Sequence, residues 1–164
     1  MEKKFILTDE FVINVFGVKL FRIKCVKSFK YANKGDSGGF IEKEGNLEQY
    51  GDAWVSGDAQ VSGDAQVYGD ARVSGDARVY GYARVSGDAK IESNDSHCGF
   101  DCFGSANRHT HAYLTKDNKV EITCGCFKGS IKEFEKKVEQ THSGTVYEKQ
   151  YKAIINVIKI KFGL

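Results

Sequence analysis

Side chains able to bind an anion are concentrated in one short polar segment of this 164-residue chain. Residues 103–110 read FGSANRHT and contain Ser105, Asn107, Arg108 and Thr110. Backbone N–H groups of a glycine-containing turn and a guanidinium can together bind a phosphate or a carboxylate. The same residues also make an ordinary polar loop. These four residues are therefore the first candidate ligand-binding site.

Histidine and cysteine residues next to this segment raise the question of a metal. A two-residue turn at 117–118 would pair His111 with Cys124 and His109 with Cys126 and would place all four on one face of a hairpin. Zinc accepts that ligand set. Alternatively, this face packs inward with cysteine as a small apolar residue, and a shift of the turn by one residue separates the four side chains. A second combination comprises His97, Cys98 and Cys102. For both sets we favour a core or linker role, and we expect no metal.

An internal repeat dominates the middle of the chain. Residues 51–92 divide without a gap into seven hexads, which are GDAWVS, GDAQVS, GDAQVY, GDARVS, GDARVY, GYARVS and GDAKIE. A strict period of six fits neither a helix nor an isolated strand, but it fits a solenoid with one short strand and one turn on each side. Three hexads make a triangular coil of 18 residues. The valine (or isoleucine) and alanine positions lie two apart and should both point inward.

The stacking of coils every 18 residues also predicts the outer surface. Trp54, Arg72 and Lys90 form one outward column, in which Arg72 can make a cation–π contact with an exposed Trp54. Arg72, Arg78 and Arg84 fall on three different sides of the triangle, so they do not form one basic patch. The Trp54–Arg72–Lys90 column is therefore a second candidate site, a face for a partner, although a solvated repeat surface is the alternative.

The repeat predicts how the rest of the chain is organised. We expect a mainly β protein with an N-terminal β-hairpin cap (1–38) that turns near Gly17, a parallel β-helix (39–92), a linker loop (93–107) and a C-terminal ββαα module (108–164). In the irregular first coil, residues 39–50, Ile41 and Leu47 fall in the alanine lane, and Lys43 and Gln49 fall in the valine lane. In the tail, capping boxes at Ser130/Glu133 and Thr145/Glu148 begin two helices.

Composition narrows the choice of partners and compartment. The net charge is only +2, so nothing favours nucleic acid or a membrane surface. No apolar run approaches the roughly 20 residues of a membrane span. An odd number of cysteines, five in all, with no secretion signal indicates reduced thiols and a cytoplasmic location.

The repeat resembles the left-handed β-helix, or hexapeptide-repeat, family. As a whole the arrangement is similar to small hexapeptide-repeat accessory proteins of phages and prophages, on the segments LFRIK (20–24), KGDSGGFIE (34–42), CGCFKG (124–129) and EQTH (139–142). The resemblance implies a left-handed helix and a non-enzymatic binding protein in the bacterial host cell. Such a protein would counteract host defence by sequestering a nucleotide-like signal or by blocking a defence protein. It would be a homo-oligomer, with a trimer as the form common among β-helix proteins.

Two other functions stay open at this point. Many left-handed β-helix enzymes are acyltransferases with a catalytic histidine, but His97, His109, His111 and His142 all lie outside the repeats, and the coils are too few for a long CoA groove. A structural or virion role is the other alternative. We expect no enzyme activity and no cofactor, and fold analogy alone does not choose among these functions.

Overall fold

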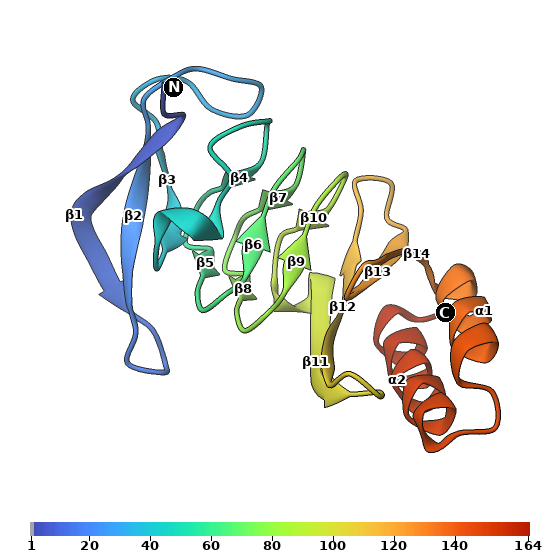
Figure 1. Cartoon of the computed structure of the whole chain (residues 1–164). Coiled ribbons are helices and arrows are strands. Elements are labelled where there is room, and N and C mark those ends of the chain that lie inside the picture. Colours follow the sequence, from blue (N-terminus) through green and yellow to red (C-terminus); the bar gives the residue numbers. More distant parts are fainter. Residues whose placement is uncertain (1) are drawn as a thin grey trace. The chain divides into compact units, whose positions relative to one another are not determined.

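The computed structural model describes residues 2–164, which form two compact units, 2–96 and 97–164 (Figure 1). The first unit contains the repeats and the second contains both α-helices of the described residues.

The first unit is a parallel β-solenoid. Its short strands are β4 (Trp54–Val55), β5 (Gln60–Val61), β6 (Gln66–Val67), β7 (Arg72–Val73), β8 (Arg78–Val79), β9 (Arg84–Val85) and β10 (Lys90–Ile91). Strands 18 residues apart pair in parallel, which gives β4–β7–β10 on one side, β5–β8 on the next and β6–β9 on the third. The predicted coil of three hexads is therefore confirmed, and the three arginines lie on three different sides.

The interior of the solenoid is made by the two predicted lanes. The alanines at 53, 59, 65, 71, 77, 83 and 89, the valines at 55, 61, 67, 73, 79 and 85 and Ile91 are all buried. At the corners the coils come so close that a Cβ on Gly57, which has a φ of +64°, would lie 3.2 Å from the carbonyl oxygen of Gly75. Glycine recurs at this corner because it allows both the positive φ and the close approach.

The first coil differs from the prediction. Ile41 pairs with Val61 and Leu47 bridges to Val67, so both residues lie in the valine lane and not in the alanine lane. This coil is 20 residues long, and the two extra residues lie between Leu47 and Val55. The prediction extends the six-residue period backward from Gly51. This extension assigns the earlier residues to the wrong lane, because the two-residue insertion leaves the six-residue spacing on either side of it unchanged.

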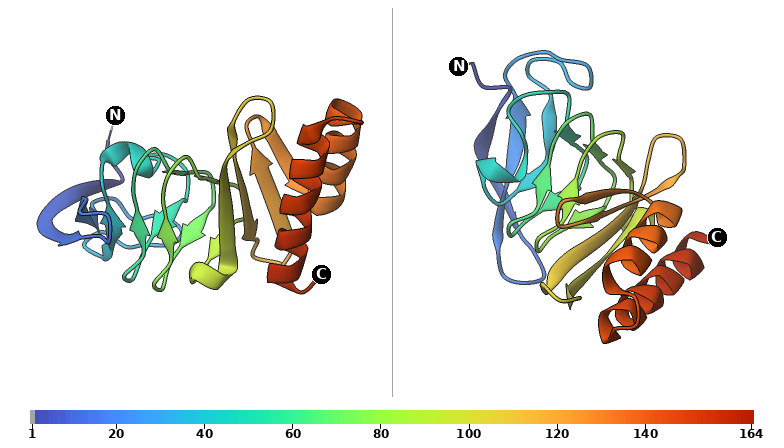
Figure 2. Two further views of the ribbon diagram at one scale, coloured as in Figure 1. Left: turned by 90° about the horizontal axis from the view of Figure 1, so that it is seen from below. Right: turned by 45° about the vertical axis from the view of Figure 1, so that its right-hand side comes forward.

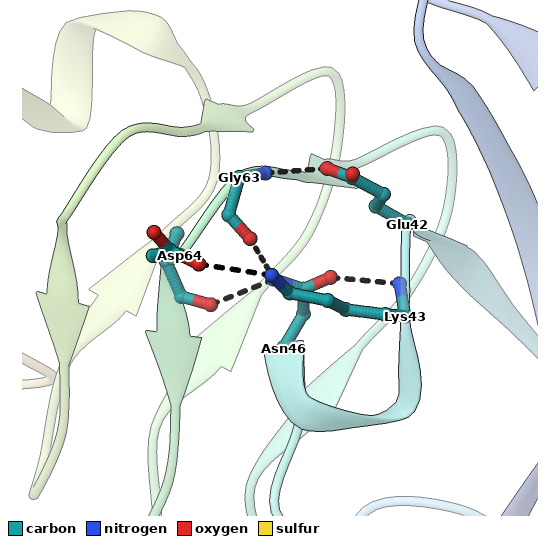
Figure 3. A network of polar contacts seen from close by, with 6 residues as sticks. Glu42, Lys43, Asn46, Gly63 and Asp64 are labelled. Carbon is teal, nitrogen blue, oxygen red and sulfur yellow. Dashed lines mark hydrogen bonds and ion pairs between the residues drawn. The ribbon is translucent and has the colours of Figure 1, made fainter.

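Side chains of this longer coil form hydrogen bonds and an ion pair with the next coil, which has the regular length (Figure 3). Gly63 N–H donates to Glu42 Oε2 at 2.6 Å, and Asn46 Nδ2 donates to the carbonyl of Gly63 at 3.0 Å. Lys43 Nζ pairs with Asp64 Oδ1 at 2.9 Å. A short 3-10 turn, Glu44–Asn46, holds Asn46 in place through the backbone of Lys43. In the first coil, polar side chains thus make hydrogen bonds that peptide groups make elsewhere in the solenoid.

The N-terminal segment extends one side of the solenoid. Strands β1 (Phe5–Ile13) and β2 (Lys19–Cys25) form an antiparallel hairpin whose turn contains Gly17, as predicted. Strand β3 (Ser37–Ile41) pairs with β2 on one edge and with β5 on the other, which gives the order β1-β2-β3-β5-β8. The hairpin therefore continues the sheet of one face.

The second unit is a four-stranded antiparallel sheet with two helices on one face (Figure 2). Its elements are β11 (His97–Phe103), β12 (Arg108–Leu114), β13 (Val120–Cys124), β14 (Phe127–Ser130), α1 (Ile131–His142) and α2 (Val146–Phe162). Both helix starts are correct. The Ser130/Glu133 capping box is complete, whereas Glu148 Oε2 accepts from Gly144 N–H and not from its N-cap residue.

The predicted linker at 93–107 is wrong. A 3-10 turn (Asn94–Ser96) and the whole of β11 occupy it, and β14 was missed, so the module is ββββαα. The β11 sequence, HCGFDCF, contains no β-branched residue, although Cys98, Phe100 and Cys102 alternate with more polar or smaller residues. It is a strand because five of its residues pair with β12, and the context of a neighbouring strand decides strand formation more than local composition does.

Candidate functional site

The hairpin register decides the zinc question. Thr110, and not His111, pairs with Cys124, because the loop after Leu114 holds five residues and has Asn118 at a φ of +56°. The one-residue shift places His111 on one face of the sheet and Cys124 on the other, where it packs in the core with the helices. The pairing that a two-residue turn at 117–118 would give is therefore wrong, and the observed register does not bring two histidines and two cysteines together.

The second possible ligand set is separated in the same way. His97 and Cys98 are consecutive residues of β11 and so point to opposite faces, and Cys102 is exposed with a φ of +63°. Within residues 2–164, no group of three or more His, Cys, Asp or Glu side chains is placed to hold a metal ion.

The histidines themselves form a row on the face opposite the helices. His97 Nδ1 lies 2.9 Å from His111 Nε2, and His109 Nδ1 lies 2.6 Å from Asp101 Oδ1. Burial, together with the nearby charge of Lys161, lowers the pKa of His97 from 6.5 to about 4. The folded protein therefore holds His97 as the neutral imidazole at physiological pH.

This depressed pKa predicts acid sensitivity of the C-terminal unit. Between pH 6.5 and about 4 the unfolded chain binds a proton at His97 that the folded chain does not, so stability should fall as the pH drops through that window. From pH 7 to pH 5 we expect a loss of at most about 2 kcal/mol. Urea unfolding followed by helical circular dichroism measures it. His97→Gln should flatten this pH dependence, and an unchanged slope in that variant would assign the effect to another group.

The polar segment 103–110 forms a tight turn fastened to α2. Gly104 N–H donates to Gln150 Oε1 at 2.9 Å, and a Cβ at Gly104 would overlap the hydroxyl of Tyr151. Asn107 has a φ of +47°, and its N–H donates to the Gly104 carbonyl. The positions of Gly104 and Asn107 are thus explained by the turn and by packing on α2.

The four predicted binding residues of this segment do not share one surface. Thr110 is fully buried, and its hydroxyl donates to Cys124 Sγ at 3.3 Å, so its inclusion in the site is wrong. Ser105, Asn107 and Arg108 are exposed. The Arg108 side chain lies against Gly125, where a Cβ would come within 2.8 Å of its guanidinium.

A cavity of about 400 Å³ lies on the β4–β7–β10 side of the solenoid. We call it the Arg72 pocket. Its floor consists of two outward columns, Trp54–Arg72–Lys90 and Ser56–Ser74–Glu92, and its wall consists of Tyr31, Asp36 and Ser37 from the β2–β3 segment. The volume is within the range of small-molecule sites, roughly 300–1,000 Å³. The second predicted site is therefore one half of a concave pocket.

The aromatic contacts differ from the prediction. Trp54 is only 4% exposed and packs edge-on against Phe29, with ring centroids 5.3 Å apart. The guanidinium of Arg72 lies 4.9 Å from the ring of Tyr31 and is not stacked on an exposed Trp54. The indole forms part of the floor, and the cation–π partner of Arg72 comes from the wall.

The charges of the pocket are unequally partnered. Lys90 pairs with Glu92 at 3.1 Å, and Lys30, which lies over the Tyr31 ring, reaches Asp70 at 3.5 Å. The guanidinium of Arg72 has neither a hydrogen bond nor an ion pair with any of residues 2–164. Its planar N–H donors are thus available to a ligand, and guanidinium donors match carboxylate and phosphate oxygens.

The sequence predicted one of the two floor columns of this pocket and neither the serine column nor the wall. The 18-residue period places Trp54, Arg72 and Lys90 in one column. Nothing in the period shows that residues 26–36 fold over that column. A usable signal is the pair of aromatic residues in SFKYAN (28–33), because large aromatic side chains are mostly buried against a neighbouring surface.

Comparison with known proteins agrees with the architecture. A family model described as YdcK Beta solenoid repeat matches residues 65–81 and 71–87. No curated protein matches the chain. The matched residues lie wholly within the hexads, and the match supports a β-solenoid-like repeat in this part of the chain.

None of the helices within residues 2–164 is long and apolar enough to cross a bilayer.

Proposed function

We propose that this protein is a non-enzymatic binding protein that holds a small anionic, nucleotide-like ligand in the Arg72 pocket. The observation that carries the proposal is a guanidinium that is positioned by an aromatic ring, faces a cavity of suitable size and has no protein acceptor. Such a group is preorganised, because the cost of ordering its side chain is met before the ligand arrives.

The lining of the pocket favours binding over catalysis. It offers serine hydroxyls and two carboxylates, Asp36 and Glu92, but neither a histidine nor a cysteine. A serine nucleophile needs an adjacent base to take its proton, and imidazole is the commonest one. The proposal therefore includes no reaction and no cofactor.

The wider role follows from the resemblance of the sequence. In this proposal the solenoid is a left-handed β-helix, and the protein is a phage-type accessory protein in the bacterial cytoplasm. It sequesters a nucleotide-like signalling molecule of host defence, with a defence protein as the alternative target. A homo-oligomer, for example a trimer, would multiply the sites, and the exposed Ser105, Asn107 and Arg108 of the C-terminal turn are a second contact surface.

The proposal predicts a specific loss of binding. Arg72→Gln should weaken the binding of adenosine 5′-monophosphate, used as a probe, by at least about 10-fold, because a charge-assisted hydrogen bond contributes roughly 1.5–3 kcal/mol. Isothermal titration calorimetry of the full chain measures this loss.

The repeat supplies a matched control for this experiment. Arg78 occupies the same hexad position on the β5–β8 side, outside the Arg72 pocket, and it too lacks an ion pair within the described chain. Arg78→Gln removes the same charge, so it should leave the affinity unchanged. Equal losses in the two variants would show a nonspecific charge effect and would refute the site.

A further inference from the structure

We infer that the Arg72 pocket recognises the sugar–phosphate part of its ligand, with the phosphate at Arg72 and Lys90 and the sugar hydroxyls at the serine column. This inference rests on the proposed function and deepens it by naming the chemical group that is read. The ligand class is a hydroxylated phosphate monoester such as a ribose phosphate.

The two floor columns have different chemistry. Arg72 begins β7 and Ser74 directly follows its last residue, so both point outward, about 6.5 Å apart along the chain. In the next coil, Lys90 lies beside Arg72 and Glu92 lies beside Ser74, with about 4.8 Å between the neighbouring strands. The Arg72–Lys90 column is therefore cationic, with Arg72 as its unpaired member because Lys90 pairs with Glu92 at 3.1 Å, and the other column offers hydroxyl and carboxylate groups.

The serine hydroxyls of the pocket are unused by the protein. Ser37, Ser56 and Ser74 make no side-chain hydrogen bond within residues 2–164. Other serines of the first unit behave differently, because the Ser28 hydroxyl accepts from Lys34 N–H and the Ser93 hydroxyl from Asp95 N–H. Three unused hydroxyls around one cavity can exchange hydrogen bonds with a polyhydroxylated ligand.

The carboxylates restrict where the phosphate can go. Asp36 and Glu92 are on the pocket lining, and each repels a second anion while accepting hydrogen bonds from hydroxyl groups. One oxygen of Asp36 already accepts from Asn33 N–H at 2.7 Å, which fixes the orientation of its carboxylate. The phosphate therefore fits the Arg72 side of the pocket and the sugar fits the other side.

The aromatic residues argue against recognition of a base. The Tyr31 ring is already contacted by the cations of Arg72 and Lys30, at 4.9 Å and 4.8 Å from its centroid. Trp54 is buried against Phe29. Both aromatic residues of the lining, Tyr31 and Trp54, are thus already engaged by other side chains, which disfavours stacking, the usual means of holding a nucleobase.

Four probes test this assignment by calorimetry on the full chain: ribose 5-phosphate, adenosine 5′-monophosphate, adenosine and inorganic phosphate. We expect ribose 5-phosphate and the monophosphate to bind within about 3-fold of each other, and adenosine not to bind. Inorganic phosphate should bind at least about 10-fold more weakly than ribose 5-phosphate, since it lacks the hydroxyl contacts.

A serine substitution separates the two halves of the ligand. Ser74→Ala should weaken ribose 5-phosphate about 3- to 10-fold and leave inorganic phosphate unchanged, as expected for one or two neutral hydrogen bonds. Ser62→Ala is the control, because Ser62 has the same hexad position on the β5–β8 side. Tryptophan fluorescence verifies that each variant keeps its solenoid.

The outcomes distinguish this inference from the proposed function. If ribose 5-phosphate fails to bind while the monophosphate binds in an Arg72-dependent way, the base is read, and the inference is overturned while the proposed function stands. The inference would also be overturned, and the proposed function would stand, if inorganic phosphate bound as tightly as the sugar phosphate and Ser74→Ala had no effect. If no probe binds in an Arg72-dependent way, both are refuted.

Discussion

Val67→Asp should unfold the solenoid unit. Val67 is 1% exposed and lies between Leu47 of the first coil and Val85 of β9. A carboxylate at this position would lose its hydration among apolar neighbours with no partner for its charge. We expect a loss of more than about 4 kcal/mol, a large part of the typical 5–15 kcal/mol stability of a folded domain.

The two units carry separate spectroscopic reporters for this experiment. Trp54, the one tryptophan of the sequence, belongs to the solenoid unit, and both α-helices of the described residues belong to the C-terminal unit. Tryptophan emission should shift to the red in Val67→Asp at room temperature. Gln66→Asp, at an exposed position of the same strand, should keep the wild-type spectrum. A wild-type melting curve for Val67→Asp would contradict the assignment of the valine lane to the core.

Lys4→Met should destabilise the same unit by about 2–4 kcal/mol, which is comparable to the removal of one partner from other buried charged hydrogen bonds. Lys4 is 4% exposed, and its Nζ donates to the carbonyls of Ala53 at 2.8 Å, Gly51 at 3.3 Å and Tyr50 at 3.4 Å. Burial lowers its pKa to about 8, so the ammonium is still charged at neutral pH.

Methionine retains the length and apolar stem of Lys4 but leaves these three carbonyls without a donor. Urea unfolding monitored by tryptophan emission measures the effect. Lys3→Met is the control, because Lys3 is half-exposed and makes only a surface pair with Glu44, worth roughly 0–1 kcal/mol. If the two variants lose equal stability, the hydrogen bonds from the Lys4 ammonium to the three carbonyls do not stabilise the unit.

The interior of the solenoid could be predicted from the sequence almost completely. Each coil repeats the same contact between residues 18 positions apart, so a local period fixes a long-range structure. The same periodicity placed Arg72 in a column with Trp54 and Lys90 and separated it from Arg78 and Arg84. The handedness of the solenoid and the biological role stay predictions.

Two errors have a common origin in register. The first coil holds two extra residues before Val55, and the β12–β13 loop holds three residues more than the two-residue turn assumed. Either change leaves the pattern of neighbouring residues intact, yet it moves Ile41 to another lane and places His111 and Cys124 on opposite faces. A shift of one residue in a strand reverses every side chain, and composition does not reveal it.

The candidate site was likewise only partly predictable from the sequence. The sequence by itself determined the Trp54–Arg72–Lys90 column of the pocket floor, because the repeat places each outward side chain relative to the next coil. Only the tertiary structure decided that Tyr31, Asp36 and Ser37 wall this floor and that Arg72 lies against Tyr31. The contact joins residues 41 positions apart in sequence through an irregular segment. Its path depends on the packing of Phe29 against Trp54, and no periodic pattern encodes that packing.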